Sequence, residues 1–137
     1  MAEAQDAVDI LLVSPFEEDY RNLSTVLSRS PYRLERVAGS EDAAGRMQAA
    51  KPRIVIAEDS VDWRRLCDAL ERLDRPPLLV VVSRLADDEL WLDVLNHGGH
   101  DLISKPFQSG DLQRLAKQVR GPAGEVTEDE AEAAVAR

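Results

Sequence analysis

The sequence predicts an α/β domain, a five-stranded parallel sheet of order 2-1-3-4-5 with helices on both faces. Short apolar runs of strand length alternate along the chain with segments whose apolar residues recur every three or four positions. Strands that alternate with crossover helices form a parallel sheet that is covered on both sides. The second strand alternates apolar and polar residues, as a half-exposed edge strand does. An edge strand in second place favours the order 2-1-3-4-5.

The expected strands differ in strength. Continuous apolar runs are typical of strands that a parallel sheet buries on both faces, and three segments have this character. The second segment alternates in polarity, and the fifth is the weakest. In chain order the segments are VDILLV at 8–13, YRLERV at 32–37, IVIA at 54–57, LLVVV at 78–82 and DLIS at 101–104.

A helix is expected after each strand, because each following segment carries an apolar stripe with three-and-four spacing. Ser40, followed by two acids, marks a helix start. Pro76-Pro77 prevents a helix from continuing into the fourth strand, and Gly121-Pro122 is expected to end the last helix. The stripes are Tyr20, Leu23, Val26 and Leu27; Ala43, Ala44 and Met47; Trp63, Leu66, Cys67, Leu70 and Leu73; Leu90, Val94 and Leu95; and Leu112, Leu115, Ala116 and Val119.

Composition restricts the class of protein. The 137 residues suffice for one domain core, expected at 7–120 between a disordered N-terminus at 1–6 and a mobile acidic tail at 121–137. No apolar run approaches the ~20 residues that span a bilayer, and the N-terminus does not resemble a signal peptide. Cys67 is the only cysteine, which excludes an internal disulfide and favours the cytoplasm. A structural zinc site is not expected either, since only two histidines accompany this cysteine.

The net charge of −9 bears on partners. Nucleic-acid binding depends on the neutralisation of phosphates by Lys and Arg, so an acidic chain is a poor candidate for it. Neither nucleic acid nor a membrane is therefore expected as a partner.

Polar residues stand where the strands end. In a sheet of this order the ligand site lies beyond the carboxyl ends of the strands, near the reversal between strands 1 and 3. The stretch RIVIAEDS, at 53–60, runs from an apolar strand directly into two carboxylates. The residues at the strand ends are Ser14-Pro15, Glu58-Asp59, Ser83 and Ser104-Lys105.

The motif ISKPF at 103–107 resembles the response-regulator receiver domain, a flavodoxin-like, CheY-like module of bacterial two-component signalling. KPRIVIAE at 51–58 and the hydroxyl of Ser83 after the fourth strand extend the resemblance, which covers about residues 7 to 120. It implies a switch in which an aspartate at the end of strand 3 receives a phosphoryl group from a histidine kinase. A Mg²⁺ ion, held by that aspartate and by acids after strand 1, assists the transfer.

Part of the family's switch is present. Lys105 falls on its lysine, Lys105-Pro106 on its cis peptide bond and Ser83 on the hydroxyl that contacts the phosphoryl group. An ammonium at Lys105 would neutralise a charged group at the end of strand 3. Leu102 stands where the family often has an aromatic switch residue. The family's coupling, in which that ring moves inward behind the hydroxyl, therefore lacks its aromatic ring here. Phe107 is expected to pack.

The rest departs from the family's pattern. Ser14-Pro15 replaces the acidic pair, and Glu17 and Glu18 beyond it suit the first turn of a helix. No cofactor is therefore expected, and Mg²⁺ is disfavoured because its sites depend on carboxylates. Glu58 occupies the acceptor position and would pair with Lys105, as a partial mimic of phospho-aspartate. Asp59 is the alternative acceptor, although Asp59 or Ser60 also suits the cap of the next helix.

These residues favour a degenerate, phosphorylation-independent receiver that is not an enzyme and contacts another protein. In the family such contact, and often homodimerisation, uses the fourth helix, the fifth strand and the fifth helix, here about 86–120. Trp91 and Leu92 are the expected anchors. His97 and His100, which flank two glycines, are expected to be surface residues of a turn.

Two alternatives remain. The chain could still accept phosphate on Asp59, or with a rearranged Mg²⁺ site. It could instead be a small flavodoxin-like enzyme or nucleotide binder, although no Gly-rich phosphate loop follows strand 1.

Overall fold

The structure is a computed structural model that describes residues 9–28 and 32–123. The chain divides into two compact units, 1–107 and 108–137, so that α6 (Ser109–Ala123) belongs to the second unit and every other helix and strand to the first. The predicted disordered N-terminus at 1–6, and the tail beyond Ala123, lie outside the described residues. Within these residues, no helix combines the length and the apolar character that a bilayer crossing requires.

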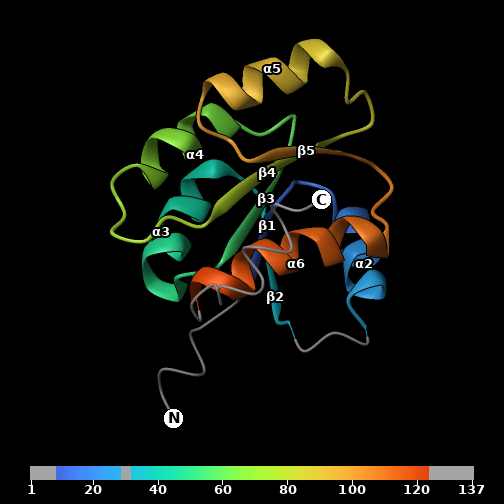
Figure 1. The fold of residues 1–137 in the computed structure, drawn as a ribbon, viewed down its shortest axis with the longest axis horizontal. Coiled ribbons are helices and arrows are strands. Elements are labelled where there is room, and N and C mark those ends of the chain that lie inside the picture. Colours follow the sequence, from blue (N-terminus) through green and yellow to red (C-terminus); the bar gives the residue numbers. More distant parts are fainter. Residues whose placement is uncertain (1–8, 29–31, 124–137) are drawn as a thin grey trace. The chain divides into compact units, whose positions relative to one another are not determined.

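The first unit is built on a parallel sheet with the strand order β2-β1-β3-β4-β5, as the sequence predicts (Figure 1). The strand β2 at one edge is half-buried along its length, which agrees with its alternating polarity. The most buried strands are β1 and β3, whose residues are all buried. The strands are β1 (Ile10–Val13), β2 (Leu34–Val37), β3 (Ile54–Glu58), β4 (Leu78–Ser83) and β5 (Asp101–Ser104).

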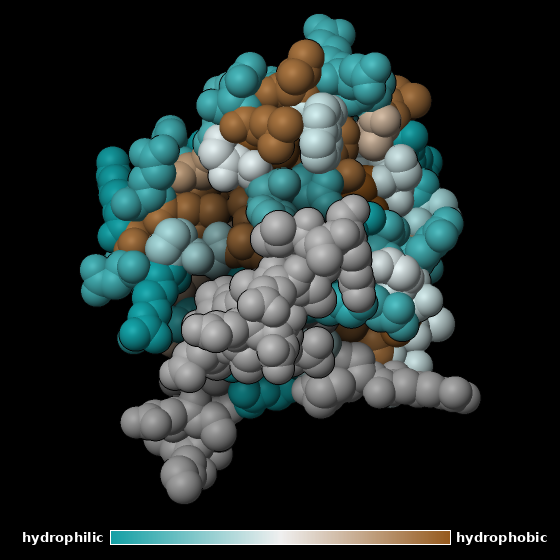
Figure 2. Space-filling view, in the orientation of Figure 1, coloured by the Kyte–Doolittle hydropathy of each residue, from teal (hydrophilic) through white to brown (hydrophobic). Residues whose placement is uncertain are grey.

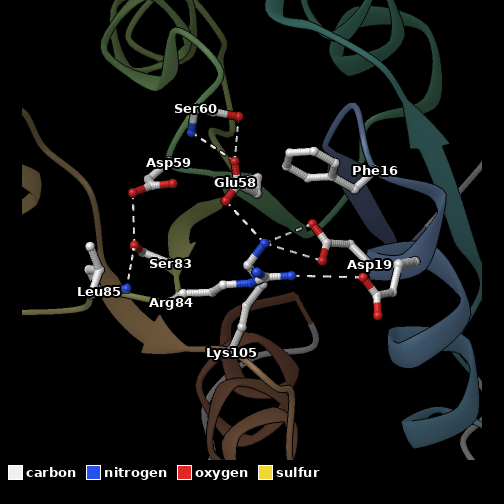
Figure 3. Close-up of a pocket in the computed structure, with 10 residues that line it drawn as sticks. Phe16, Asp19, Glu58, Asp59, Ser60, Ser83, Arg84, Leu85 and Lys105 are labelled. Atoms are coloured by element: carbon white, nitrogen blue, oxygen red, sulfur yellow. Dashed lines mark hydrogen bonds and ion pairs between the residues drawn. The ribbon is translucent and has the colours of Figure 1, made fainter.

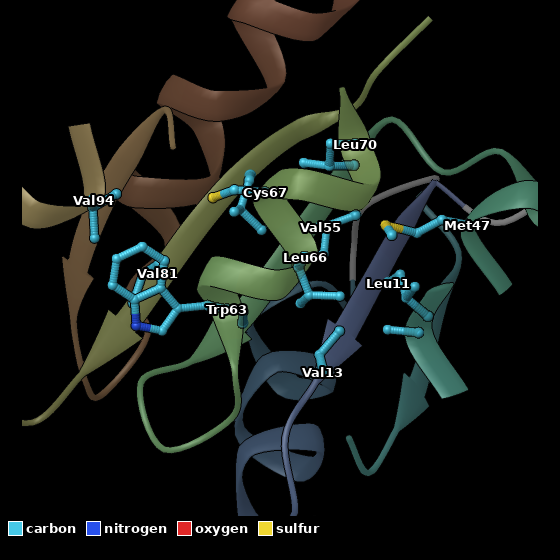
Figure 4. Close-up of a cluster of buried hydrophobic side chains, with 13 residues drawn as sticks. Leu11, Val13, Met47, Val55, Trp63, Leu66, Cys67, Leu70, Val81 and Val94 are labelled. Carbon is cyan, nitrogen blue, oxygen red and sulfur yellow. The ribbon is translucent and has the colours of Figure 1, made fainter. Parts of the chain in front are cut away.

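Side chains of the central strands alternate between the two faces of the sheet. On one face, Leu11, Val55 and Val81 pack in a cluster with α3 (Ser40–Ala50), α4 (Trp63–Leu70) and Val94 of α5 (Asp88–Asn96) (Figure 4). The helix α2 (Glu17–Val26) buries Leu23, which does not belong to this cluster. The helices therefore cover both faces of the sheet.

One helix start differs from the prediction. The cap of α4 is Asp62, whose carboxylate accepts a hydrogen bond from the N–H of Arg65, so neither Asp59 nor Ser60 caps this helix. The chain needs one more turn after β3 before α4 begins, and Val61 N–H closes that turn on the Glu58 carbonyl. The helix α3 begins at Ser40 as expected, although Gly39 is its cap.

The last helix continues beyond its predicted end. Gly121-Pro122 lies inside α6, which reaches Ala123. A proline in the last turn removes only one main-chain hydrogen bond, so it does not prevent this extension.

Two residues of the predicted apolar stripes are exposed, among the stripe residues whose burial the structure describes. Tyr20 is 38% exposed and Leu95 is 40% exposed, whereas Asp19 on α2 is buried. Asp19, Leu23 and Leu27 are spaced by four residues, so they follow one line along the helix. The buried side of α2 is therefore rotated by one residue from the side that Tyr20 predicts. This rotation brings the Asp19 carboxylate to the sheet.

The turn after α5 has the form that the two glycines predict. Gly98 has a φ of 93°, and the N–H groups of Gly98 and Gly99 bond to the carbonyls of Leu95 and Val94. This arrangement is a Schellman motif, which ends a helix with a left-handed residue. A Cβ atom on Gly99 would lie 2.4 Å from Cγ1 of Val94, so this position has no room for a side chain.

His97 has more contacts than a surface turn residue needs. Its ring lies edge-on to the Trp63 ring, with centroids 5.6 Å apart, and its Nδ1 is 3.1 Å from the Asp93 carboxylate. His100 is partly buried, and its N–H donates to the carbonyl of Leu79 in β4. The prediction of two simple surface histidines is therefore incomplete.

Candidate functional site at the carboxyl edge of the sheet

A pocket of about 300 Å³ lies beyond the carboxyl ends of the strands, where the strand order predicts a site (Figure 3). Four of its lining residues are acids and two are bases. The pocket is lined by Phe16, Glu18, Asp19, Glu58, Asp59, Ser60, Ser83, Arg84, Leu85 and Lys105.

Lys105 follows β5 and reaches the centre of this pocket. Its Nζ lies 3.0 Å from Oε2 of Glu58 and 3.2 Å from Oδ2 of Asp19, and these three side chains are each less than a tenth exposed. The Glu58–Lys105 pair is the one that the sequence predicts, and the Lys105–Pro106 peptide bond is cis. One buried ammonium thus neutralises two buried carboxylates only in part.

Asp19 is the site residue that the sequence analysis missed. The Ser14 hydroxyl donates to Oδ2 of Asp19 at 2.7 Å, and the N–H of Phe16 donates to that hydroxyl at 3.1 Å. Ser14, at the end of β1, therefore orients an acid from the helix. The signal was present, because Asp19 is four residues before the apolar Leu23. Glu17 and Glu18, the acids that the sequence places just beyond Ser14-Pro15, are exposed.

Glu58 ends β3 opposite Val82 of β4 and is 4% exposed. Its Oε1 accepts hydrogen bonds from both the N–H and the hydroxyl of Ser60. Burial raises the pKa of this carboxyl, but the bonds from Ser60 and Lys105 outweigh burial and lower the pKa from 4.5 to about 2. Glu58 is therefore a fixed negative charge at neutral pH.

Asp59 interacts with the other predicted switch residue. The Ser83 hydroxyl donates to Oδ2 of Asp59 at 2.7 Å and accepts from the N–H of Leu85 at 3.0 Å. The N–H of Asp59 bonds to the Val82 carbonyl, which turns this residue toward the end of β4. Burial, opposed by the Ser83 bond and assisted by the charge of Glu58, raises the pKa of Asp59. The two neighbouring carboxylates thus have opposite pKa shifts.

The same arrangement of helices and strands occurs in solved structures. No protein-family profile and no curated protein sequence matches this chain. A receiver domain protein from Methanospirillum hungatei superposes with a TM-score of 0.72 at 17% identity, over 87% of this chain and 98% of that one. A signal receiver domain from Bermanella marisrubri gives 0.69 at 23% identity, over 82% and 98%.

This chain has the receiver-domain fold. A third structure with this fold, the receiver domain of a sensor histidine kinase from Pseudomonas aeruginosa, has a TM-score of 0.71 at 18% identity. The match covers 84% of this chain and 98% of that one, whose active-site cleft holds a coordinated magnesium ion.

The residues at this edge of the receiver fold do not suit a Mg²⁺ ion. Magnesium favours several oxygen ligands in octahedral geometry. Here the Lys105 ammonium lies between the carboxylates of Asp19 and Glu58, and Pro15 supplies no side-chain oxygen. Across the described ranges, no group of three or more His, Cys, Asp or Glu side chains could hold a metal ion.

The switch position Leu102, the packing residue Phe107 and the expected anchors Trp91 and Leu92 do not line the pocket. Leu102 of β5 is half-buried and packs against the core cluster of the receiver fold. Phe107 is buried, as expected for a packing role. Trp91 and Leu92 lie on α5 and are 37% and 57% exposed. They form a surface that is separate from the charged pocket.

The pKa of Glu58 predicts a pH dependence of stability. Because its pKa in the folded domain is lower than 4.5, Glu58 contributes stability above this pH and loses the contribution as the pH falls toward 2. The difference in unfolding free energy between wild type and Glu58→Gln should therefore shrink by about 2–3 kcal/mol over this interval. Urea unfolding, measured at several pH values, gives this difference.

Asp59→Asn is the matched control. The pKa of Asp59 is raised in the folded domain, so the pH dependence of its contribution to stability has the opposite sign. Ionised Asp59 destabilises the fold above its folded pKa, so the difference between wild type and this variant should move in favour of wild type on acidification. Equal slopes for both variants would contradict the assignment of opposite shifts.

Proposed function

We propose that this chain is a receiver-like signalling module of the two-component or phosphorelay type that works without phosphorylation, by contact with another protein. It is a binding module and not an enzyme in this proposal. Its place in this proposal is the cytoplasm, because Cys67 is the only cysteine and no internal disulfide can form.

The observation that carries the proposal is that carboxylates already occupy both groups expected to contact a phosphoryl group. Lys105 pairs with Glu58 at 3.0 Å, and the Ser83 hydroxyl donates to Asp59 at 2.7 Å. In the receiver family that this chain resembles, the lysine and the hydroxyl make such contacts when the domain carries phosphate. Here Glu58 at the end of β3 and Asp59 in the following turn provide these contacts permanently.

The charge of the pocket also opposes phosphoryl transfer. A phosphoryl group brings nearly two negative charges, which an enzyme must neutralise with cations. The four acids of the pocket face only two bases. Of these, Lys105 is shared by Asp19 and Glu58, and Arg84 lies 3.9 Å from Glu18. A further anion would have no unshared cation at the pocket to bind.

Asp59 supports a second candidate function, a phosphate-accepting receiver. Its carboxyl lines the pocket and bonds to Ser83, the hydroxyl that a phosphoryl group would need. The third candidate, a small enzyme or nucleotide binder, has less support. The turn from β1 into α2 is Ser14-Pro15-Phe16, which has no glycine to bring the backbone close to a phosphate.

Incubation with acetyl phosphate and Mg²⁺, followed by intact mass spectrometry, tests the proposal. We expect the wild-type mass to stay unchanged. An adduct of one phosphoryl group would overturn phosphorylation independence, and its loss in Asp59→Asn would assign the acceptor to Asp59. A magnesium-dependent change in Trp63 fluorescence would contradict the absence of a fitting metal site.

A further inference from the structure

The helix α5 presents an apolar surface that the fold does not use. Trp91, Leu92 and Leu95 are 37%, 57% and 40% exposed, and we call these three residues the α5 patch. Their spacing of one and four residues places them on one side of the helix. Hydrophobic side chains gather over α5 at the top of Figure 2, with hydrophilic ones around them.

The opposite side of α5 fixes the helix to the domain. Val94 is fully buried in the core cluster, and Leu90 packs against it. Asp93 pairs with Arg64 of α4 and with His97. The Arg64 guanidinium in turn lies 4.4 Å from the centre of the Trp63 ring. These contacts attach α5 to the core cluster and to α4, so the α5 patch has a defined orientation.

Within α5, the charged residues next to the α5 patch are all acidic. Asp88 precedes Trp91 by three residues and Leu92 by four, so its carboxylate lies on the same side. Asp87 and Glu89 are also exposed, and α5 contains no Lys or Arg. A partner surface complementary to this side has apolar side chains for the patch and positive charges for the acids.

A second copy of this chain does not offer such a surface through α5. Its own helix would bring another Asp88 and Glu89 and no Lys or Arg to the contact. The whole chain has a net charge of −9, which adds to the repulsion between copies. The charge pattern therefore favours a different protein over a homodimer.

We propose that the α5 patch docks an amphipathic helix of another protein whose apolar stripe is flanked by Lys or Arg. The apolar stripe covers Trp91, Leu92 and Leu95, and a basic side chain lies opposite Asp88. A helix is the fitting partner because the side chains of one exposed helix form ridges that pack into the grooves of another. This inference rests on the proposed function and names the chemistry of its partner.

A labelled synthetic helix of Leu and Lys, with Leu at three-and-four spacing, is the probe, and fluorescence anisotropy measures its binding. The same helix with Glu in place of Lys should not bind. Trp91→Ala and Leu92→Ala should each weaken binding about tenfold or more, as buried interface anchors do. Asp88→Asn should weaken it about threefold, with less dependence on salt.

Two surface variants serve as matched controls. Tyr20→Ala removes an aromatic residue that is 38% exposed on α2, and Glu41→Gln removes an exposed acid on α3. Both should bind the Leu/Lys helix as the wild type does. Circular dichroism checks that each variant is folded, and Leu92→Ala carries the test if Trp91→Ala unfolds.

Two other outcomes of the binding experiments overturn the inference. Equal binding by wild type and the patch variants would mean that the helix adheres to acidic surface in general. A dimer in sedimentation velocity that dissociates in Leu92→Ala would assign the patch to a second copy. The mass assay with acetyl phosphate is independent of this test, so a phosphoryl adduct would contradict the proposed function while binding at α5 stood.

Discussion

Lys105→Met should lower the free energy of unfolding by about 3–5 kcal/mol at neutral pH, the usual cost of removing one partner from a buried ion pair. The variant leaves Asp19 and Glu58, each 4% exposed, without their shared cation. Two buried carboxylates then lack a compensating cation, and the cost of their desolvation remains in the folded state. Urea unfolding at neutral pH measures the loss.

The design includes a rescue and a control. Adding Asp19→Asn and Glu58→Gln to Lys105→Met removes the uncompensated charges and should recover most of the lost stability. Lys117→Met changes an exposed lysine on α6 and should alter stability by less than about 0.5 kcal/mol. A Lys105→Met variant as stable as this control would mean that the carboxylates do not depend on the ammonium.

Trp63→Ala should cost about 3–5 kcal/mol, because it removes the largest fully buried side chain of the core. Trp63 is 2% exposed and begins α4, where its ring contacts both the Arg64 guanidinium and the His97 ring. Its loss therefore opens a cavity and also removes support for the Arg64–Asp93 pair. Far-UV circular dichroism in urea measures the change without relying on tryptophan fluorescence.

The chain supplies a matched control of the same residue type. Trp91→Ala removes a ring that is 37% exposed, so its cost should be less than about 1 kcal/mol. Trp63→Phe keeps part of the buried volume and should fall between the two. If the two alanine variants were equally stable, Trp63 would not be a core residue.

The strand pattern was sufficient to predict the sheet. The apolar runs at 54–57 and 78–82 became the buried strands β3 and β4, and the alternating run at 32–37 became the edge strand β2. This worked because burial on one or two faces of a sheet is a local property that successive side chains record. The pairing of Glu58 with Lys105 was also predictable, because parallel strands bring their carboxyl ends to one edge.

Helix rotation was less predictable. Tyr20 and Asp19 are neighbours in the sequence, and each lies on a helical stripe that also contains Leu23. Periodicity alone favoured the aromatic ring, since a carboxylate is not expected on a buried face. The cap of α4 was missed for a related reason, because Asp59, Ser60 and Asp62 all suit a helix start and only the turn after β3 decides among them.

The sequence by itself determined the strands, their parallel order, and the acids, hydroxyls and lysine that meet where the strands end. Only the tertiary structure decided which carboxylates share the buried Lys105. Asp19 comes from a helix, and its burial becomes favourable once Ser14 and Lys105, from two different strand ends, lie within hydrogen-bonding distance. No local pattern records that compensation, because its partners are 5 and 86 residues away along the chain.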